Sequence, residues 1–387
     1  EISLRMLHTL FLVLLWTGGV DGFMGASRMP LDLSRPTKCN QRDRAGHAVS
    51  TAAGDGRRAL RARLVGVGSH APGTSISNSD LELLVETSDE WISKRTGIRR
   101  RHLLKPHESM TDVAATAARN ALENAGVAAE EVNLIIMATS TPDDLFGDAP
   151  FLASEIGATN AVAFDLTAAC SGFLFGVNTA AQFLHNGVYS TALVIGGDAM
   201  SRWVDWSDRN TCVLFGDGAG AAVMKRTAEG EEGVLGFQMH SDGSGRCDLN
   251  LAYDGEEVPL GDVTSVTRGG YKGIAMNGKE VYKFATSKVP KVVGEALEAA
   301  SMTADDIDWL LLHQANVRIM ETVAKKLGIP MEKVICNVDE YGNTSAGSIP
   351  LALDGAVRSG KVKKGDLIAV SGFGAGLSWG AAVIRWG

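Results

Sequence analysis

The sequence predicts a layered α/β fold built from two similar halves. From residue 64 onward, short apolar segments with the length of strands alternate with longer amphipathic segments that have the period of helices. This alternation is typical of sheets covered by helices. The same order of elements occurs twice, and a charged, glycine-containing stretch at residues 227–233 separates the two runs. We therefore expect an internal structural duplication.

Each expected element follows from its local pattern. In the first half, mainly apolar runs predict strands at residues 64–67, 132–139, 161–166, 192–196 and 220–224, and helical spacing predicts helices at 111–125 and 171–185. In the second half, strands are expected at 234–240, 309–313, 333–338, 367–371 and 381–385, and helices at 289–300, 318–327 and 345–357. Glycine-rich stretches such as 216–220 and 372–376 predict tight turns, but no Gly-Lys-Ser/Thr follows to make a phosphate loop.

Composition excludes several classes of protein. The 387 residues are 45% hydrophobic and 21% charged, which fits a globular chain with two half-sized cores. The net charge of −8 argues against a partner nucleic acid. Five cysteines, odd in number and without a CxxC pair, indicate neither a disulfide framework nor a zinc site.

The first 63 residues have the composition of a targeting leader. Residues 1–22 predict a signal peptide, because Arg5 precedes an apolar run at 10–16 that is too short to span a bilayer, and small residues follow it. Residues 23–63, rich in Arg, Ser, Thr and Ala, are expected to be a disordered transit peptide. Together they resemble the bipartite leaders of plastids acquired by secondary endosymbiosis. We expect a plastid stromal protein, without membrane attachment in its mature form, with halves at 64–230 and 231–387.

One cysteine lies where a thiol can become a nucleophile. Cys170 follows an apolar strand and precedes a predicted helix. Helix N-termini favour a thiolate and can hold a developing oxyanion. The alternative is a small buried core residue.

Two further residues supply complementary chemistry. His313 follows the apolar run 309–312, so its imidazole emerges at a strand carboxyl end, and the other seven histidines lack such a setting. Asn343 lies in a glycine-flanked turn before a small-residue helix, where a turn or cap role is equally consistent with the local pattern. A thiol, an imidazole and an amide together can provide a nucleophile and donors for an oxyanion or enolate.

The motifs around these residues resemble those of a known family. They read TSDEWI (87–92), RTGI (95–98), TAACSG (167–172), FGDGAG (215–220), HQANVR (313–318), GNTSA (342–346) and GFGAG (372–376). Their order is similar to that of β-ketoacyl-acyl-carrier-protein synthase III, the condensing enzyme that starts type II fatty-acid synthesis, in its plastid form. The resemblance covers residues 64–387 and implies a thiolase-like α/β fold of five αβαβα layers.

The resemblance also implies a reaction. Cys170 would take an acetyl group from acetyl-CoA, and His313 with Asn343 would stabilise the enolate formed when malonyl-acyl-carrier protein loses CO2. The N–H groups of Cys170 and Ala375 would form the oxyanion hole. The products would be acetoacetyl-acyl-carrier protein, CoA and CO2. Acetyl-CoA is then a substrate, and no metal or other cofactor is expected.

The same resemblance implies binding residues and partners. For CoA these are Thr87, Trp91, Arg95, Arg209, Gly278 and Asn316, with the adenine between Trp91 and Arg209. For the acyl pocket they are Phe146, which would reach across the interface of an expected homodimer, and Phe373. Lys283, Arg318, Lys325 and Lys326 would dock the acyl carrier protein, although an ordinary solvated helix face would show the same charges.

Other functions stay open at this point. A related acyltransferase could use a different acyl-CoA primer, and a non-catalytic relative could bind acyl groups or carrier protein. Cys-His-Asn also occurs in papain-like cysteine hydrolases, but the Cys-Gly-Ser-Cys-Trp neighbourhood of those enzymes is absent here.

Overall fold

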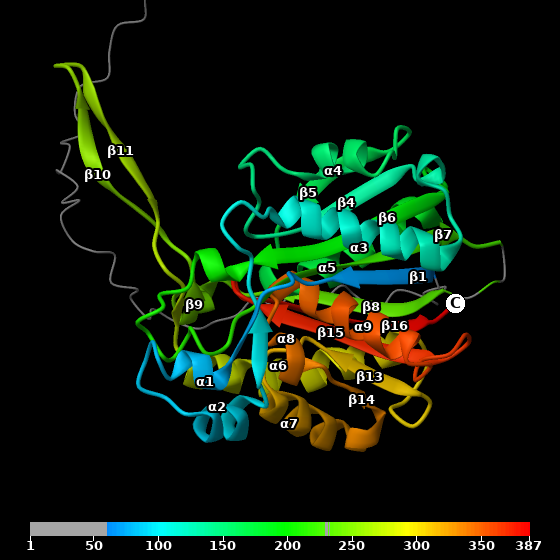
Figure 1. Ribbon diagram of the computed structural model, residues 1–387. Helices are drawn as coiled ribbons and strands as arrows, with labels where there is room; N and C mark the ends of the chain where they lie inside the picture. Colours follow the sequence, from blue (N-terminus) through cyan, green and yellow to red (C-terminus); the bar gives the residue numbers. More distant parts are fainter. Residues whose placement is uncertain (1–59, 229–230, 232) are drawn as a thin grey trace, which may run out of the picture. The chain divides into compact units, whose positions relative to one another are not determined.

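The computed structural model describes residues 60–228, 231 and 233–387, all of which belong to one compact unit (Figure 1). The predicted signal peptide and all but the last residues of the predicted transit peptide lie outside these residues. Strand β1 (Ala62–His70) begins before the expected boundary at residue 63, and Leu60 already pairs with Val234. Residues 60–63 are therefore not disordered, since their backbone groups bond within the fold, and the leader boundary itself stays a prediction.

The first half forms a five-stranded sheet with the order β1-β7-β6-β4-β5. Its other strands are β4 (Leu134–Ala138), β5 (Val162–Leu166), β6 (Thr191–Ala199) and β7 (Asp217–Arg226). The β1/β7 and β7/β6 pairs are antiparallel, whereas β6/β4 and β4/β5 are parallel.

The second half repeats this arrangement. Its strands are β8 (Val234–Ser241), β13 (Trp309–Leu312), β14 (Val334–Ile335), β15 (Leu367–Gly374) and β16 (Ser378–Arg385). The order β8-β16-β15-β13-β14 has the same succession of antiparallel and parallel pairs as the first sheet. Since β7 ends at Arg226 and β8 begins at Val234, the repeats meet at the stretch that the sequence marked as a boundary.

Helices complete five αβαβα layers (Figure 1). Helix α3 (Met110–Ala125) covers the outer face of the first sheet, and α6 (Gly278–Ala299) with α7 (Val317–Leu327) covers the second. Between the sheets, α5 (Gly172–His185) and α9 (Ser348–Arg358) each contact strands of both. The close fit of α3 explains one glycine: a Cβ on Gly68 of β1 would lie 2.2 Å from the Ala121 nitrogen.

Shorter elements connect the layers. The helices are α1 (Asn78–Leu81), α2 (Asp89–Thr96), α4 (Ala149–Glu155) and α8 (Val338–Tyr341). The strands are β2 (Ser75–Ser77), β3 (Arg100–His102), β9 (Leu249–Asn250), β10 (Tyr253–Leu260), β11 (Thr264–Tyr271) and β12 (Ala275–Met276). The 3-10 turns are η1 (Ala129–Glu131), η2 (Ala169–Ser171), η3 (Met200–Arg202), η4 (Gly243–Asp248), η5 (Met331–Lys333) and η6 (Ser345–Gly347).

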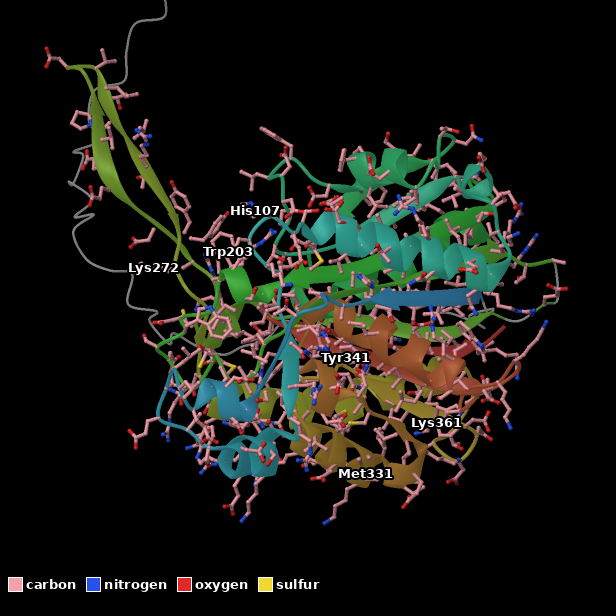
Figure 2. The ribbon with its side chains drawn as sticks, viewed as in Figure 1. His107, Trp203, Lys272, Met331, Tyr341 and Lys361 are labelled. Carbon is pink, nitrogen blue, oxygen red and sulfur yellow. The ribbon has the colours of Figure 1, made fainter. Side chains whose placement is uncertain are left out.

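The exposed hairpin β10–β11 has no counterpart among the predicted elements. It projects away from the sheets, and Trp203 and Lys272 mark its base (Figures 1 and 2). The Trp203 ring meets Tyr271 edge-on at 5.9 Å. Glycines and charged residues fill much of the hairpin, so its sequence lacks the apolar alternation that indicates a half-buried strand.

Helix α6 begins 11 residues before the predicted start at 289. Pro290 lies inside the helix, where its missing N–H leaves the Thr286 carbonyl without an intrahelical donor. Lys326 Nζ donates to that carbonyl at 2.8 Å. The helix thus continues through the proline with a lysine of α7 replacing the lost hydrogen bond.

No helix in the described part of the chain is long and apolar enough to cross a membrane.

Candidate active site

Cys170 lies in η2, between the end of β5 and the start of α5, as the sequence predicted. It lines a cavity of about 580 Å³ that His313 and Asn343 also line. The backbone of β15 passes so close that a Cβ on Gly374 would lie 2.7 Å from the Cys170 nitrogen. The residue before the cysteine, Ala169, has a φ of 47°, which is uncommon for a residue with a side chain. The two halves of the chain therefore bring their candidate residues to one cavity.

His313 follows β13, and its main-chain N–H donates to the Ser371 carbonyl at 2.8 Å. The ring nitrogen Nδ1 lies 2.6 Å from Ser348 Oγ, which also accepts the Gln314 N–H at 3.3 Å. Phe373 packs edge-on against the imidazole at 5.1 Å. Burial lowers the pKa of His313 to about 3, so the imidazole is neutral at pH 7.

The backbone around Asn343 is fixed by a parallel bridge to Phe215. The Asn343 N–H donates to Leu214 at 2.9 Å, and the Asn343 carbonyl accepts from Gly216 at 3.0 Å. The side-chain Oδ1 accepts the Ser345 N–H at 2.9 Å. Because the oxygen of the amide is engaged there, the Nδ2 group is the part of the side chain left to donate into the cavity.

The electrostatics of the thiol differ from the sequence-based expectation. Burial raises the pKa of Cys170 to about 12, against the thiolate-favouring effect expected of the helix N-terminus. Forming the free thiolate at pH 7 would therefore cost about 7 kcal/mol. Ser345 Oγ donates to Sγ at 3.4 Å. The resting group is a protonated thiol, and its reaction requires a proton acceptor.

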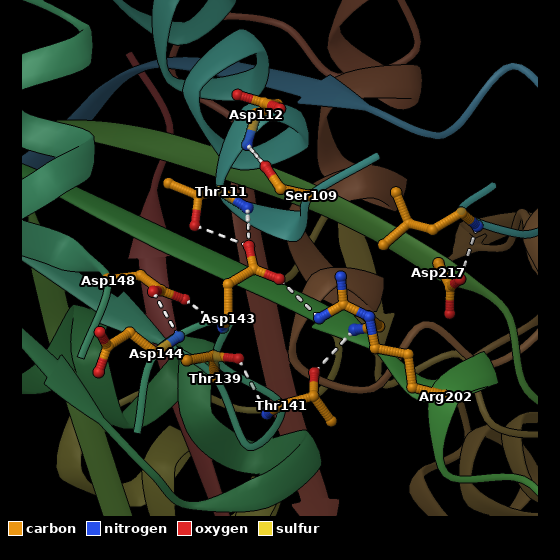
Figure 3. Close-up of polar contacts among 12 residues, drawn as sticks. Ser109, Thr111, Asp112, Thr139, Thr141, Asp143, Asp144, Asp148, Arg202 and Asp217 are labelled. Carbon is orange, nitrogen blue, oxygen red and sulfur yellow. Dashed lines mark hydrogen bonds and ion pairs between the residues drawn. The ribbon is translucent and has the colours of Figure 1, made fainter. Parts of the chain in front are cut away.

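An acidic loop forms one rim of the cavity (Figure 3). The Asp148 carboxylate accepts the N–H groups of Asp143 at 2.7 Å and Asp144 at 3.0 Å. Asp143 in turn pairs with Arg202 at 2.6 Å. These contacts provide acceptors for the backbone N–H groups of the turn before Leu145, which lines the cavity. The rim is therefore held by hydrogen bonds within the loop.

The predicted adenine site is arranged differently from the expectation. The guanidinium groups of Arg95 and Arg209 lie 4.7 Å and 4.9 Å from the centre of the Trp91 ring. Arg209 also donates to the Glu86 carbonyl at 2.7 Å. The expected position of an adenine between Trp91 and Arg209 is thus filled by direct contact of these two side chains, and a base could enter only if Arg209 moved.

The other predicted CoA residues divide into two groups. Gly278 and Asn316 line the cavity of Cys170, and Asn316 Oδ1 caps α7 by accepting the Arg318 N–H at 2.9 Å. Thr87 does not line that cavity, but its buried hydroxyl has no protein partner. A buried hydroxyl without a partner is costly, so this position fits contact with a polar ligand.

The two predicted acyl-pocket residues separate. Phe373 is buried and lines the cavity beside His313. Phe146 is 99% exposed and lines a different hollow, formed with residues of β5. Within the described chain, Phe146 therefore does not bound the space around Cys170.

The predicted docking cations all lie on the surface of α6 and α7. Lys283 is paired with Glu280 at 3.6 Å, and Arg318 lines the hollow beside Trp91. Lys325 is exposed. Lys326 is engaged with the Thr286 carbonyl, which gives it a structural role that the sequence pattern did not indicate.

Three residues that touch the site were not singled out from the sequence: Asp198, Ser345 and Ser348. Both serines lie in motifs quoted above, but a serine gives no signal of which group it will contact. Asp198 ends the apolar run 192–197, and a carboxylate at a strand end was the signal that could have identified it.

Residues 60–228 and 233–387 contain no group of His, Cys, Asp and Glu side chains that could hold a metal. Among the described cysteines, Cys170, Cys212 and Cys336 carry free thiols. Cys247 is disulfide-bonded, which the sequence did not indicate.

The duplicated five-layer fold, with a cysteine facing an imidazole and an amide in one cavity, defines a condensing acyltransferase of the thiolase-like fold. Family models described as 3-oxoacyl-[acyl-carrier-protein] synthase III and its C-terminal part match residues 164–243 and 297–386. The chain belongs to the β-ketoacyl-[acyl-carrier-protein] synthase III family.

Individual relatives match most of the chain. The synthase III of Microcystis aeruginosa is 59% identical over 324 residues, 84% of this chain and 97% of the relative. That of Synechocystis is 55% identical over 324 residues, 84% and 98% of the two chains. The crystal structure of the Aquifex aeolicus synthase III is 41% identical with a TM-score of 0.77, over 84% of this chain and all of the other.

Proposed function

We propose that this chain condenses acetyl-CoA with malonyl-acyl-carrier protein, forming acetoacetyl-acyl-carrier protein, CoA and CO2, and so initiates type II fatty-acid synthesis. The observation that carries this proposal is the single cavity where Cys170, neutral His313 and the oriented Asn343 amide meet. The names of the relatives, which are synthases acting with acyl carrier protein, agree with it.

In the first half-reaction, Cys170 Sγ attacks the acetyl-CoA carbonyl carbon. The N–H groups of Cys170 and Ala375 hold the resulting oxyanion, since both residues line the cavity and β15 lies against η2. The C–S bond to CoA then breaks, CoA leaves as its thiolate and takes up a proton, and an acetyl thioester remains on the enzyme.

In the second half-reaction, His313 and Asn343 act on the malonyl thioester. We assign the imidazole proton to Nε2, because Ser348 Oγ accepts the Gln314 N–H and can donate its own proton to Nδ1. Nε2–H and the Asn343 Nδ2 group then donate to the thioester oxygen. They stabilise the enolate left when CO2 departs, and its carbon attacks the acetyl-enzyme and releases Cys170.

This chemistry needs no metal or prosthetic group, because the thiol supplies the nucleophile and hydrogen-bond donors stabilise the negative charge. Acetyl-CoA enters as a substrate. We propose that Trp91, Arg95 and Arg209 hold its nucleotide end, with Arg209 leaving the Trp91 ring when adenine binds, and that Gly278 and Asn316 flank the pantetheine.

The direct test measures the two half-reactions separately. With labelled acetyl-CoA and malonyl-acyl-carrier protein, Cys170→Ala should lose condensation and keep some decarboxylation. His313→Ala and Asn343→Ala should keep self-acetylation and lose decarboxylation. Absence of acetoacetyl product with the unaltered enzyme, or equal condensation by Cys170→Ala, would contradict the proposal. Longer or branched acyl-CoA primers in the same assay test the alternative of a different primer, and absence of any acyl-enzyme would favour the non-catalytic alternative.

We propose that the carrier protein docks on Lys283, Arg318 and Lys325, which lie on α6 and α7; Arg318 lines the hollow beside Trp91. Charge reversal at Lys325, which lines neither this hollow nor the cavity of Cys170, should raise the KM for malonyl-acyl-carrier protein and weaken its dependence on salt, without changing acetylation by acetyl-CoA.

We also propose a homodimer joined along β5. This strand is at the edge of the first sheet, where Phe146, Phe151 and Val162 are all more than half exposed. Phe146 would then complete the acyl pocket of the partner subunit. Light scattering on the unaltered chain and on Phe146→Asp tests this, with a monomeric variant as the expected result.

Plastid localisation through a bipartite leader is the remaining proposal. The cyanobacterial relatives are consistent with a plastid lineage. A fluorescent protein carrying residues 1–63 at its N-terminus should accumulate in the plastid, and retention in the secretory pathway would contradict the transit function.

A further inference from the structure

The condensing function proposed above leaves the thiol proton of Cys170 without an acceptor. His313 is poorly suited to the task, because burial lowers its pKa to about 3 and so disfavours an imidazolium. No hydrogen bond joins its ring to Sγ among the described contacts; the polar side chain that meets the sulfur is Ser345, with Oγ 3.4 Å from Sγ.

Ser345 is held in an unusual position. It opens η6 with a φ of 49°, a left-handed conformation that is uncommon for a residue with a side chain. Its N–H donates to Asn343 Oδ1, and its hydroxyl donates to Cys170 Sγ at 3.4 Å. The same hydroxyl lies near Asp198, where it acts to lower the pKa of the carboxyl. The local backbone strain thus accompanies a hydroxyl placed between a thiol and a carboxylate.

Asp198 is fully buried at the end of β6. Its carboxylate accepts hydrogen bonds from Thr139 Oγ1 at 3.1 Å, the Ser140 N–H at 2.7 Å, Thr141 Oγ1 at 2.9 Å and the Ala346 N–H at 3.1 Å. All these donors are neutral, and in residues 60–228 and 233–387 no lysine, arginine or histidine forms an ion pair with it.

Burial without a cation raises the pKa of Asp198 above the ordinary value of a carboxyl group. A carboxylate with a raised pKa is a stronger base than an exposed one, as general-base catalysis near neutral pH requires.

We propose that Asp198 accepts the Cys170 proton through the Ser345 hydroxyl during acetyl transfer. The Ser345 hydroxyl, which donates to Sγ in the resting arrangement, first turns about its C–O bond so that its proton points to Asp198 and its oxygen can accept. As Sγ forms its bond to the acetyl carbon, the thiol proton passes to Ser345 Oγ and the Ser345 proton passes to Asp198. The C–S bond to CoA breaks, and the proton on Asp198 returns by the same route to the departing CoA thiolate. Ser345 touches the reacting sulfur, and Asp198 acts through it.

Two ionisable groups lie near the Ser345 hydroxyl besides Asp198. Cys170, on η2, is in contact with it, and His313, at the end of β13, lines the same cavity. Asp198 is the charged side chain that acts on the thiol, and its effect without a relay is to raise the pKa of Cys170 by repulsion of the thiolate. If Asp198 acts only by repulsion, Asp198→Asn should make the Cys170 thiol more reactive. If Asp198 accepts the thiol proton through Ser345, the same substitution should make the thiol less reactive.

The test follows acylation of Cys170 by acetyl-CoA in rapid-mixing experiments and its alkylation by iodoacetamide, located by mass spectrometry, from pH 6 to 10. Through the relay, Ser345→Ala and Asp198→Asn should each slow both reactions at pH 7 by about 100-fold, the scale of general-base catalysis. Raising the pH should restore the variants as hydroxide replaces the base. The double variant should be no slower than either single one.

Thr139→Val is the matched control, because it removes a neutral hydrogen bond from the same carboxylate but leaves the route to Sγ intact. It should stay within about threefold of the unaltered enzyme. Ser345→Ala keeps every contact of Asp198 with the other four donors, so it carries the test if Asp198→Asn folds poorly. Malonyl decarboxylation, which uses His313 and Asn343, should be retained.

Two results would overturn the relay. One is Asp198→Asn reacting as fast as the unaltered enzyme or faster; the other is Ser345→Ala with an unchanged pH profile. The alkylation measurement needs no substrate, so it decides the relay even if condensation with acetyl-CoA is not the reaction. Failure of the condensation assay with normal alkylation in all variants would instead count against both proposals.

Discussion

Removal of the Ser348 hydroxyl should separate the two half-reactions. Ser348 Oγ lies 2.6 Å from His313 Nδ1, and both side chains are almost completely buried. Ser348→Ala leaves Nδ1 without this partner, and the imidazole proton is no longer held on Nε2. Losing one partner of a buried hydrogen bond costs about 1–3 kcal/mol. At 1.36 kcal/mol for each factor of ten, this corresponds to a decarboxylation rate lower by about 5- to 150-fold.

The assay compares CO2 release from malonyl-acyl-carrier protein with acetylation of Cys170 by acetyl-CoA. Acetylation should change by less than about threefold, because His313 has no role in that step. Ser371→Ala is the matched control: it also removes a buried serine hydroxyl, which donates to the Gly380 carbonyl at 2.7 Å, but leaves the His313 side chain untouched. Equal losses in both half-reactions, or the same effect from Ser371→Ala, would refute the assignment of the imidazole proton.

Three further predictions concern the binding of acetyl-CoA, the stability of the fold and the dependence of that stability on pH. Trp91→Ala should raise the KM for acetyl-CoA by about 5- to 30-fold with kcat little changed, measured by steady-state kinetics, since ring contacts contribute about 1–2 kcal/mol. Lys326→Met leaves the Thr286 carbonyl unpaired and should lower the free energy of urea unfolding by about 1–2 kcal/mol, while affinity for carrier protein by calorimetry changes less than with Arg318→Met. Burial lowers the pKa of His313 from 6.5 to about 3, so below pH 6.5 the unfolded chain binds a proton on this histidine that the folded chain does not bind. The free energy of unfolding should therefore fall as the pH drops from 6.5 toward 3. His313→Gln should lose less of it than the unaltered chain between pH 7 and pH 4.5, measured by urea titration.

The architecture could be predicted because the two halves repeat a pattern that depends on local periodicity. The runs that form β4, β6 and β13 are apolar enough to be recognised as strands buried on both faces, and each occurs where expected. The hairpin β10–β11 could not be found in this way, because both of its faces are exposed and no apolar alternation is needed. The helix α6 continues through Pro290 because Lys326 on another helix pairs with the freed Thr286 carbonyl, a contact that the local pattern does not show.

The candidate site shows the same division. Cys170 and His313 stand at the ends of recognisable strands, so their residue types and positions were enough to select them. The ionisation of the thiol was predicted in the wrong direction, since position before a helix is visible in the sequence but burial is not. Phe146 was expected to reach the acyl pocket of a partner subunit; it is exposed beside β5, and its role stays a prediction because it depends on a second chain.

By itself, the sequence determined the duplicated α/β fold and the family, and it predicted the three residues proposed to supply nucleophile, imidazole and amide, because these depend on periodicity and on short ordered motifs. Only the tertiary structure decided how those groups are protonated and what supports them. Ser348 reaches His313 from 35 residues away, and Ser345 joins Cys170 from 175 residues away. The first contact lies within the second half and the second joins the two halves, so both depend on tertiary packing, and burial then sets the charge of each group.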